Sequence, residues 1–137
     1  MAYDDQNIFA RILRGELPAI KVYEDERVLA FMDIMPQADG HTLVIPKAPA
    51  ETLLDLAPEE AAYTIQVVQK IAQAMKLALD VPGIVLMQLS GAAAGQTVPH
   101  VHFHLIPSSV HDLGKHGAKM GDQVLIAALA EKIKAAL

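Results

Sequence analysis

Apolar side chains recur along this chain of 137 residues at two kinds of spacing, and these spacings predict eight elements. Spacings of three and four residues are typical of helices and occur at residues 5–14, 58–80 and 122–137. Short runs rich in β-branched and aliphatic residues predict strands at 21–24, 28–33, 41–46, 84–89 and 98–106. Because a small turn at 91–96 joins the last two strands, we expect them to pair in antiparallel fashion. The order of elements indicates one α+β domain over residues 1–137, built around an antiparallel sheet.

The helical spacings also predict which side chains face the sheet. In the helix at 58–80, apolar residues recur at alternating spacings of four and three, and we expect one inward stripe: Ala61, Ile65, Val68, Ala72, Met75 and Leu79. In the last helix, Leu129 and Ile133 should point inward together with either Leu125 or Ile126.

Three histidines alternate with apolar residues in the strand predicted at 98–106. Successive side chains of a strand point to opposite faces, so His100, His102 and His104 should share one face while the residues between them enter the core. Three interpretations are open: hydrogen-bonded surface histidines, a metal site, or catalysis on phosphorus or an acyl group by an imidazole. One strand cannot easily wrap three imidazoles around one ion, and the strict alternation favours catalysis.

The turn before this strand favours phosphorus as the reacting atom. Residues 91–95 are all glycine or alanine, so backbone N–H groups can approach an anion closely. Gln96 and Thr97 add side-chain donors. An ordinary Gly-Ala hairpin turn is the alternative interpretation of this segment.

Composition and charge exclude several classes of protein. The net charge of -5 argues against a general nucleic-acid binder, which needs a basic surface. The longest apolar run, at 124–130, has seven residues and is too short for a membrane span. The chain has no cysteine, which excludes disulfides, thiolate catalysis and cysteine zinc sites. The acidic first residues show no signal-peptide pattern, so we expect a cytoplasmic protein without a membrane partner.

Three segments together resemble one known family. The run HVHFHLIP at 100–107 is similar to the signature of the histidine triad (HIT) superfamily, in which three histidines alternate with apolar residues. YEDERVLAFMDIMPQADGHTLVIPK at 23–47 and GAAAGQTVPHVHFHLIP at 91–107 resemble the Hint-like branch of that superfamily. The resemblance implies a HIT-like fold, namely a five-stranded antiparallel sheet with a long helix and shorter terminal helices, usually in a homodimer.

The resemblance implies a nucleotide hydrolase that needs no cofactor. Its substrates would be purine nucleoside monophosphate derivatives (AMP-like or GMP-like), cleaved at the α-phosphorus through a nucleotidyl-histidine intermediate. By resemblance, His102 is the nucleophile, with a backbone carbonyl fixing its tautomer, and His104 donates to a phosphate oxygen. His100 and His41 match supporting histidines, which are expected to hydrogen-bond with each other.

The remaining site residues follow from the same resemblance. The Gly95 N–H would hold a phosphate oxygen, and Gln96 and Thr97 would lie near the phosphate or the leaving group. Asp33 matches the residue that accepts both ribose hydroxyls. The apolar walls of the base pocket would be formed by Ile8, Phe9, Ile12, Phe31 and Ile34, each of which is equally plausible as a core residue.

Three departures from the family pattern bear on the function. No thiols stand at residues 7–10, where many bacterial relatives carry a Cys-x-x-Cys zinc site, so we expect no structural metal. Leu89 replaces an asparagine near the phosphates and cannot donate to them, so we expect lower activity or a different substrate unless Gln88 or Ser90 compensates. Ser108 replaces an arginine found in relatives that cut dinucleoside polyphosphates. The second replacement favours phosphoramidates over dinucleoside polyphosphates as substrates.

Several alternatives stay open beside the phosphoramidate hydrolase. They are a dinucleoside polyphosphate hydrolase, a nucleotide-binding module with little catalysis, and a metalloprotein that uses His41 with the three alternating histidines. His111 and His116 lie in the loop predicted at 107–121, either exposed to solvent or near the leaving group.

Overall fold

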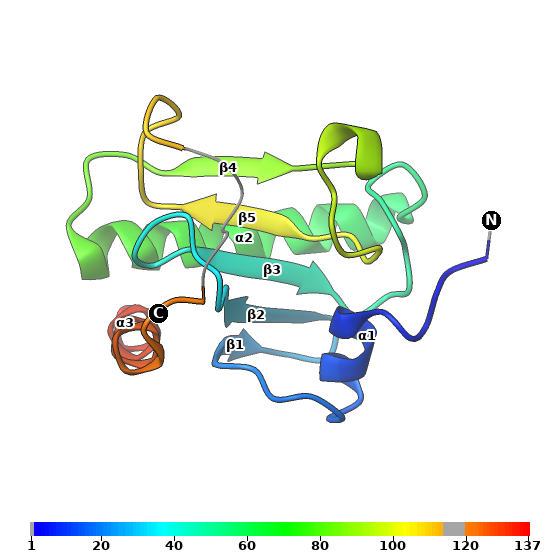
Figure 1. Ribbon diagram of the computed structural model, residues 1–137, viewed down its shortest axis with the longest axis horizontal. Coiled ribbons are helices and arrows are strands. Elements are labelled where there is room, and N and C mark those ends of the chain that lie inside the picture. The colour runs from blue at the N-terminus through cyan, green and yellow to red at the C-terminus, as the bar shows by residue number, and fades with distance from the viewer. Residues whose placement is uncertain (1, 114–119) are drawn as a thin grey trace.

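The computed structural model describes residues 2–113 and 120–137 and confirms the α+β class. Figure 1 shows one antiparallel sheet with helices packed on it. The elements follow the predicted order, with one short 3-10 helix in the turn before the last strand: α1 (Ile8–Leu13), β1 (Lys21–Glu24), β2 (Val28–Met32), β3 (Thr42–Pro46), α2 (Pro58–Leu79), β4 (Val85–Gln88), η1 (Ala92–Ala94), β5 (Phe103–Ile106) and α3 (Gln123–Ala135).

The five strands lie in the order β1-β2-β3-β5-β4, and every neighbouring pair is antiparallel. The predicted pairing of the last two strands is confirmed, with Val85 opposite Ile106. Strand β5 lies between β3 and β4, which brings Leu43 of β3 directly opposite His104 of β5. The register therefore determines the position in the sheet of His104, the last of the three alternating histidines.

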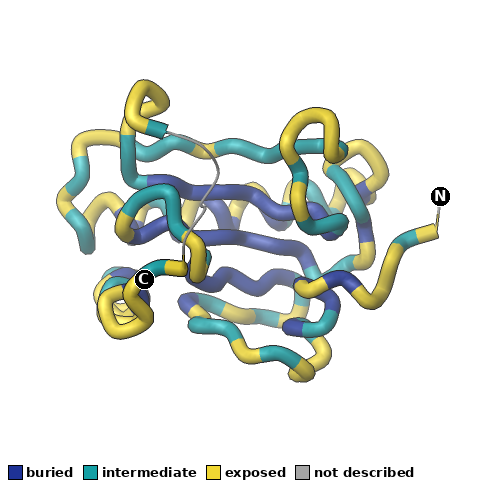
Figure 2. The backbone as a smooth tube through the Cα atoms, in the orientation of Figure 1, coloured by how far each residue is buried: buried dark blue, intermediate teal, exposed yellow. Residues whose placement is uncertain are grey.

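The two faces of the sheet are covered by different elements. On one face, alternate residues of the strands pack with α2 and α3 in the larger apolar cluster. On the other face, α1 packs on a smaller cluster: Phe9, Ile12, Leu29, Phe31, Leu43 and Ile45. Because both faces are covered, β2 and β3 are buried along their whole length and read as continuous apolar runs (Figure 2).

The buried face of α2 differs from the predicted stripe. The buried residues are Thr64, Val67, Val68, Ile71, Ala74 and Met75, whereas Ile65 is 44% exposed. The prediction was right for Val68 and Met75, which are buried, and Ala61, Ala72 and Leu79 are partly buried and pack against the same cluster. It was wrong for Ile65, which borders the edge strand β4 rather than the centre of the sheet. In α3, Ile126 and Ile133 are buried and Leu125 is exposed, so the second of the two predicted stripes is confirmed.

The last strand is shorter than predicted. It begins at Phe103, because the chain turns before it: the His100 N–H donates to Val98 O and the Val101 N–H donates to Ala50 O. The predicted strand over 98–106 was therefore wrong in its first half. Within the described part of the chain, no helix combines the length and the apolar character that crossing a membrane requires.

Candidate active site

A cavity of about 330 Å³ lies beside α1, over the smaller apolar cluster. Its size is in the range of sites for small ligands. Nine of the residues that the sequence singled out line it: Ile8, Phe9, Ile12, Phe31, Asp33, Ile34, Thr97, His102 and His104. The helix α1 reaches this position because Asn7 caps it, accepting the Ala10 N–H on Oδ1 at 2.8 Å. The cavity is thus lined by apolar side chains on the side of α1 and also by the imidazoles of His102 and His104.

His102 lies on the cavity wall with only 4% of its surface exposed. Its Nδ1 is 2.6 Å from the carbonyl oxygen of His100. A carbonyl can only accept, so Nδ1 carries the ring proton and the lone pair of the neutral imidazole is on Nε2. The ring of Phe9 packs edge-on against His102 with 4.9 Å between centroids. The carbonyl contact expected from the sequence is therefore present, and it gives His102 the tautomer that a nucleophilic Nε2 requires.

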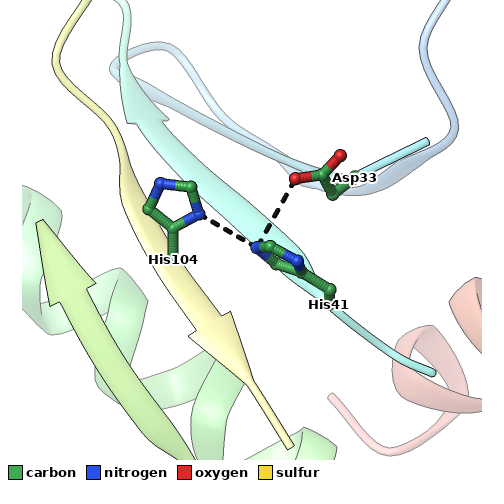
Figure 3. Close-up of side chains that lie close together, drawn as sticks. All are labelled: Asp33, His41 and His104. Carbon is green, nitrogen blue, oxygen red and sulfur yellow. Dashed lines mark hydrogen bonds and ion pairs between the residues drawn. The ribbon is translucent and has the colours of Figure 1, made fainter. Parts of the chain in front are cut away.

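His104 belongs to a relay of hydrogen bonds that also fixes its tautomer. The backbone N–H of Gln37 donates to His41 Nδ1 at 3.1 Å, so a neutral His41 carries its proton on Nε2. That nitrogen lies 2.9 Å from His104 Nδ1, which accepts the proton (Figure 3). A neutral His104 consequently holds its own proton on Nε2. This nitrogen is a donor, as a group that contacts a phosphate oxygen must be.

Asp33 connects the relay to the cavity. Its Oδ2 lies 3.5 Å from His41 Nε2 (Figure 3). Its Oδ1 accepts the Met35 N–H at 2.8 Å. The carboxylate favours a proton on His41 Nε2, because its negative charge attracts the positive end of the N–H bond. Asp33 also lines the cavity, so one carboxylate lies on the cavity wall and contacts the His41–His104 pair behind it.

His41 and His100 do not form the hydrogen bond expected between them. His41 pairs with His104, and both ring nitrogens of His100 have other partners. His100 Nε2 donates to Pro46 O at 2.8 Å, and Nδ1 lies 2.5 Å from the hydroxyl of Tyr3. The expectation was wrong because the His100 ring nitrogens are taken up by Pro46 O and the Tyr3 hydroxyl, while His41 Nε2 is paired with His104. Burial lowers the pKa of His100, with a smaller contribution from His102, although the bond to Pro46 acts in the opposite direction.

The turn at 91–96 uses its polar groups internally. The Gly95 N–H, expected to bind a phosphate oxygen, donates to Ala92 O at 3.0 Å because η1 closes a 3-10 turn there. The Gln96 side chain accepts the Gly91 N–H and donates to Glu51 O and Val98 O at 2.7 and 2.9 Å. The Gly95 N–H and the Gln96 side chain thus have partners within the protein, and their expected places at or near the phosphate stay predictions. Thr97, the next residue, lines the cavity.

The other residues noted in the sequence lie away from the cavity. Leu89 and Ser108 are half-buried and do not line it, and Gln88 and Ser90 hydrogen-bond to each other at 3.0 Å. His111 is exposed, and His116 lies outside the described residues. Gln37 and Tyr3 were not predicted from the sequence: Gln37 acts through its backbone N–H, which any residue type provides, and Tyr3 contacts His100, 97 residues away.

One group of described residues has donors close enough together for a metal ion, namely Asp33, His41 and His104, whose ligand atoms lie within 4.8 Å of one another. His41 Nε2 and His104 Nδ1 are 2.9 Å apart, whereas two imidazole nitrogens on a tetrahedral zinc ion would be about 3.3 Å apart. The distance between His41 Nε2 and His104 Nδ1 is that of a hydrogen bond, in which the two nitrogens share one proton. His100 and His102, which the metalloprotein hypothesis included, are not in this group.

Comparison with known proteins agrees with this geometry. The family model of the HIT domain matches residues 14–111. A crystal structure of a Hit-like protein from Bartonella henselae aligns with a TM-score of 0.92 at 49% identity, covering 100% of both chains. A HIT-like protein of Methanocaldococcus jannaschii is 46% identical over 100 residues, which are 73% of this chain and 77% of that protein. The adenosine 5'-monophosphoramidase of Saccharomyces cerevisiae is 41% identical over 100 residues, 73% of this chain and 61% of the yeast protein.

Proposed function

The chain belongs to the HIT family, and on that premise we propose that it is a nucleotide-binding hydrolase acting on purine nucleoside phosphoramidates. The observation that carries the proposal is the ring of His102 on the cavity wall, with Nδ1 held by the His100 carbonyl. The similarity to a yeast adenosine 5'-monophosphoramidase supports the substrate class. We further propose that residues 1–137 act as a single HIT domain.

The reaction proceeds in two displacements. His102 Nε2 attacks the α-phosphorus, the P–N bond to the amine breaks, and the amine leaves with a proton taken from solvent to give a nucleotidyl-histidine. Water then attacks the same phosphorus and gives up one proton to solvent. The P–N bond to His102 breaks, and a nucleoside monophosphate and the neutral imidazole, still protonated on Nδ1, are produced. His104 Nε2–H donates to a non-bridging oxygen, on which negative charge grows in both transition states.

The rest of the cavity holds the nucleoside. Asp33 accepts hydrogen bonds from the ribose hydroxyls, because a carboxylate group on this wall offers acceptor oxygens for both. The base lies between the apolar side chains that α1 and β2 contribute: Ile8, Phe9, Ile12, Phe31 and the adjoining Ile34. Thr97, which also lines the cavity, lies near the proposed position of the reacting phosphate.

Replacement of the proposed nucleophile tests the mechanism. His102→Ala should abolish release of nucleoside monophosphate from an adenosine phosphoramidate while AMP still binds, and His111→Ala, at an exposed position, should leave turnover unchanged. Intact mass measured after rapid quench should show a nucleotidyl adduct on the wild type and on His111→Ala but not on His102→Ala. Full turnover by His102→Ala would overturn the mechanism, and a wild type that binds AMP but releases no product would identify a binding module.

We also propose that the protein forms a homodimer through the edge strand β4. An edge strand leaves backbone groups unpaired, and beside this one lie Leu86, 47% exposed, and Ile65 on α2. With residues from the neighbouring strands and helix these two line one apolar groove, which suits a two-fold interface. Sedimentation should give a dimer for the wild type and a monomer for Leu86→Glu; a monomeric wild type would contradict the proposal.

A further inference from the structure

A chain of hydrogen bonds connects the segment before α1 to the proposed nucleophile. Asn7 Nδ2 donates to the Tyr3 hydroxyl oxygen at 2.9 Å, and this hydroxyl lies 2.5 Å from His100 Nδ1. The other nitrogen of His100 contacts Pro46 O, and its backbone carbonyl contacts His102 Nδ1. Tyr3 does not line the cavity, so it reaches the reacting imidazole only through His100.

The direction of each bond follows from the groups involved. Pro46 O can only accept, so His100 Nε2 carries a proton, and burial lowers the pKa of His100, which favours the neutral ring. The lone pair of His100 is then on Nδ1 and accepts the Tyr3 hydroxyl proton. The Tyr3 oxygen in turn accepts from Asn7. Each proton has one acceptor, which makes the orientation of His100 unique.

We propose that the Tyr3 hydroxyl is a positioning group for His102. By binding Nδ1 it fixes the His100 ring from the side opposite Pro46, and the carbonyl of the same residue then holds the His102 proton on Nδ1. The inference rests on the proposed function, since it assigns Tyr3 a part in preparing the nucleophile for attack. Tyr3 contacts no substrate, so its contribution lies in the chemical step and not in nucleotide binding.

The hydroxyl can be separated from the packing of the ring. The rings of Tyr3 and His100 meet edge-on with 5.7 Å between centroids, a contact that Tyr3→Phe retains. The substitution leaves a buried ring nitrogen of His100 without its donor, and such a group is costly to bury. Without the hydroxyl, the His100 ring gains freedom to tilt or to change tautomer. The His100 carbonyl, which contacts His102 Nδ1, then moves with the ring.

Tyr63→Phe is a matched control. It makes the same chemical change at a half-buried tyrosine whose hydroxyl donates to Asp25 at 2.5 Å and which does not line the cavity. Asn7→Ser is a second variant, because serine keeps the helix cap but removes the donor to Tyr3. All three proteins are compared with the wild type by steady-state kinetics on an adenosine phosphoramidate and by imidazole ¹⁵N shifts of uniformly labelled protein.

For Tyr3→Phe we expect kcat to fall about three- to tenfold with KM within twofold, less than the roughly 100-fold that a 1 Å displacement can cause. The ¹⁵N shifts of His100 and His102 should change in Tyr3→Phe, change less in Asn7→Ser, and stay constant in Tyr63→Phe. If Tyr3→Phe does not fold, Asn7→Ser decides, and it must then show a loss of kcat with KM within twofold, together with changed ¹⁵N shifts of His100 and His102.

Three results would overturn the proposal: unchanged kcat and ¹⁵N shifts in Tyr3→Phe, a loss confined to KM, or an equal loss of kcat in Tyr63→Phe. Failure of the proposed function gives a different result, namely no turnover and no adduct in the wild type. The ¹⁵N shifts then decide alone, since the His102 signals must still respond to Tyr3→Phe and not to Tyr63→Phe if the hydroxyl fixes this ring.

Discussion

Asp25 holds the β1–β2 hairpin to α2, and its replacement should destabilise the fold without affecting the active site. Its Oδ2 accepts the hydroxyls of Tyr23 and Tyr63 at 2.7 and 2.5 Å, and its Oδ1 accepts the N–H groups of Arg27 and Val28, each at 2.8 Å. Asp25→Asn keeps an acceptor for the two backbone groups but replaces the oxygen that binds both hydroxyls.

The pKa of Asp25 gives the size of the effect. Burial would raise this pKa, but the hydrogen bonds from Tyr63, Tyr23 and the backbone outweigh burial and lower it from 3.8 to about 2. That difference is equivalent to about 2.4 kcal/mol, and solvent screening at this half-buried site reduces it to roughly 1–2 kcal/mol. Because the folded-state pKa is lowered, the stabilisation is complete above the unfolded pKa and is lost as pH falls through about 2.

Urea unfolding at several pH values measures this contribution. Asp25→Asn should be less stable than the wild type by roughly 1–2 kcal/mol at pH 7 and 5, and the difference should shrink markedly by about pH 2.5. Glu26→Gln, the same chemical change at an exposed neighbour, should have no such effect. A difference between Asp25→Asn and the wild type that stays constant down to about pH 2.5 would show that the ionised carboxylate does not stabilise the hairpin.

Two further predictions concern the relay behind the cavity. His41→Ala removes the donor to His104 Nδ1, so kcat should fall roughly 10- to 100-fold with little change in KM; a kcat within twofold of wild type would contradict the relay. Asp33→Ala removes the proposed ribose acceptor, so the preference for a ribonucleoside over its 2'-deoxy analogue, measured by kcat/KM, should fall at least about tenfold. Retention of that preference would place ribose recognition elsewhere.

The strands were more predictable than the faces of the helices. The strand at 21–24 was predicted with its exact bounds, and the others were too long by one or two residues at their ends, except β5. Burial of β2 and β3 on both faces makes them clear as apolar runs. The stripe of α2 was misjudged because an apolar residue such as Ile65, exposed at the sheet edge, looks the same in sequence as one in the core.

The candidate site was predictable where strand alternation holds. His102 and His104 both line the cavity, as the pattern of the segment suggests, although regular pairing starts only at Phe103. The pattern failed for His100, whose place depends on a turn and on contacts with Tyr3 and Pro46. Those partners lie 97 and 54 residues away along the chain, and no local periodicity encodes them.

The charged groups that line the cavity bear on which class of phosphate derivative this acidic chain can bind. Among the described residues that line the cavity there is one carboxylate, Asp33, and no lysine or arginine. The cavity lining thus supplies no permanently charged cation to balance several phosphate charges. A phosphoramidate ester carries one negative charge at its phosphorus, whereas a dinucleoside polyphosphate carries one on each phosphate. This charge difference supports the proposed preference for the singly charged substrate, independently of the serine at position 108.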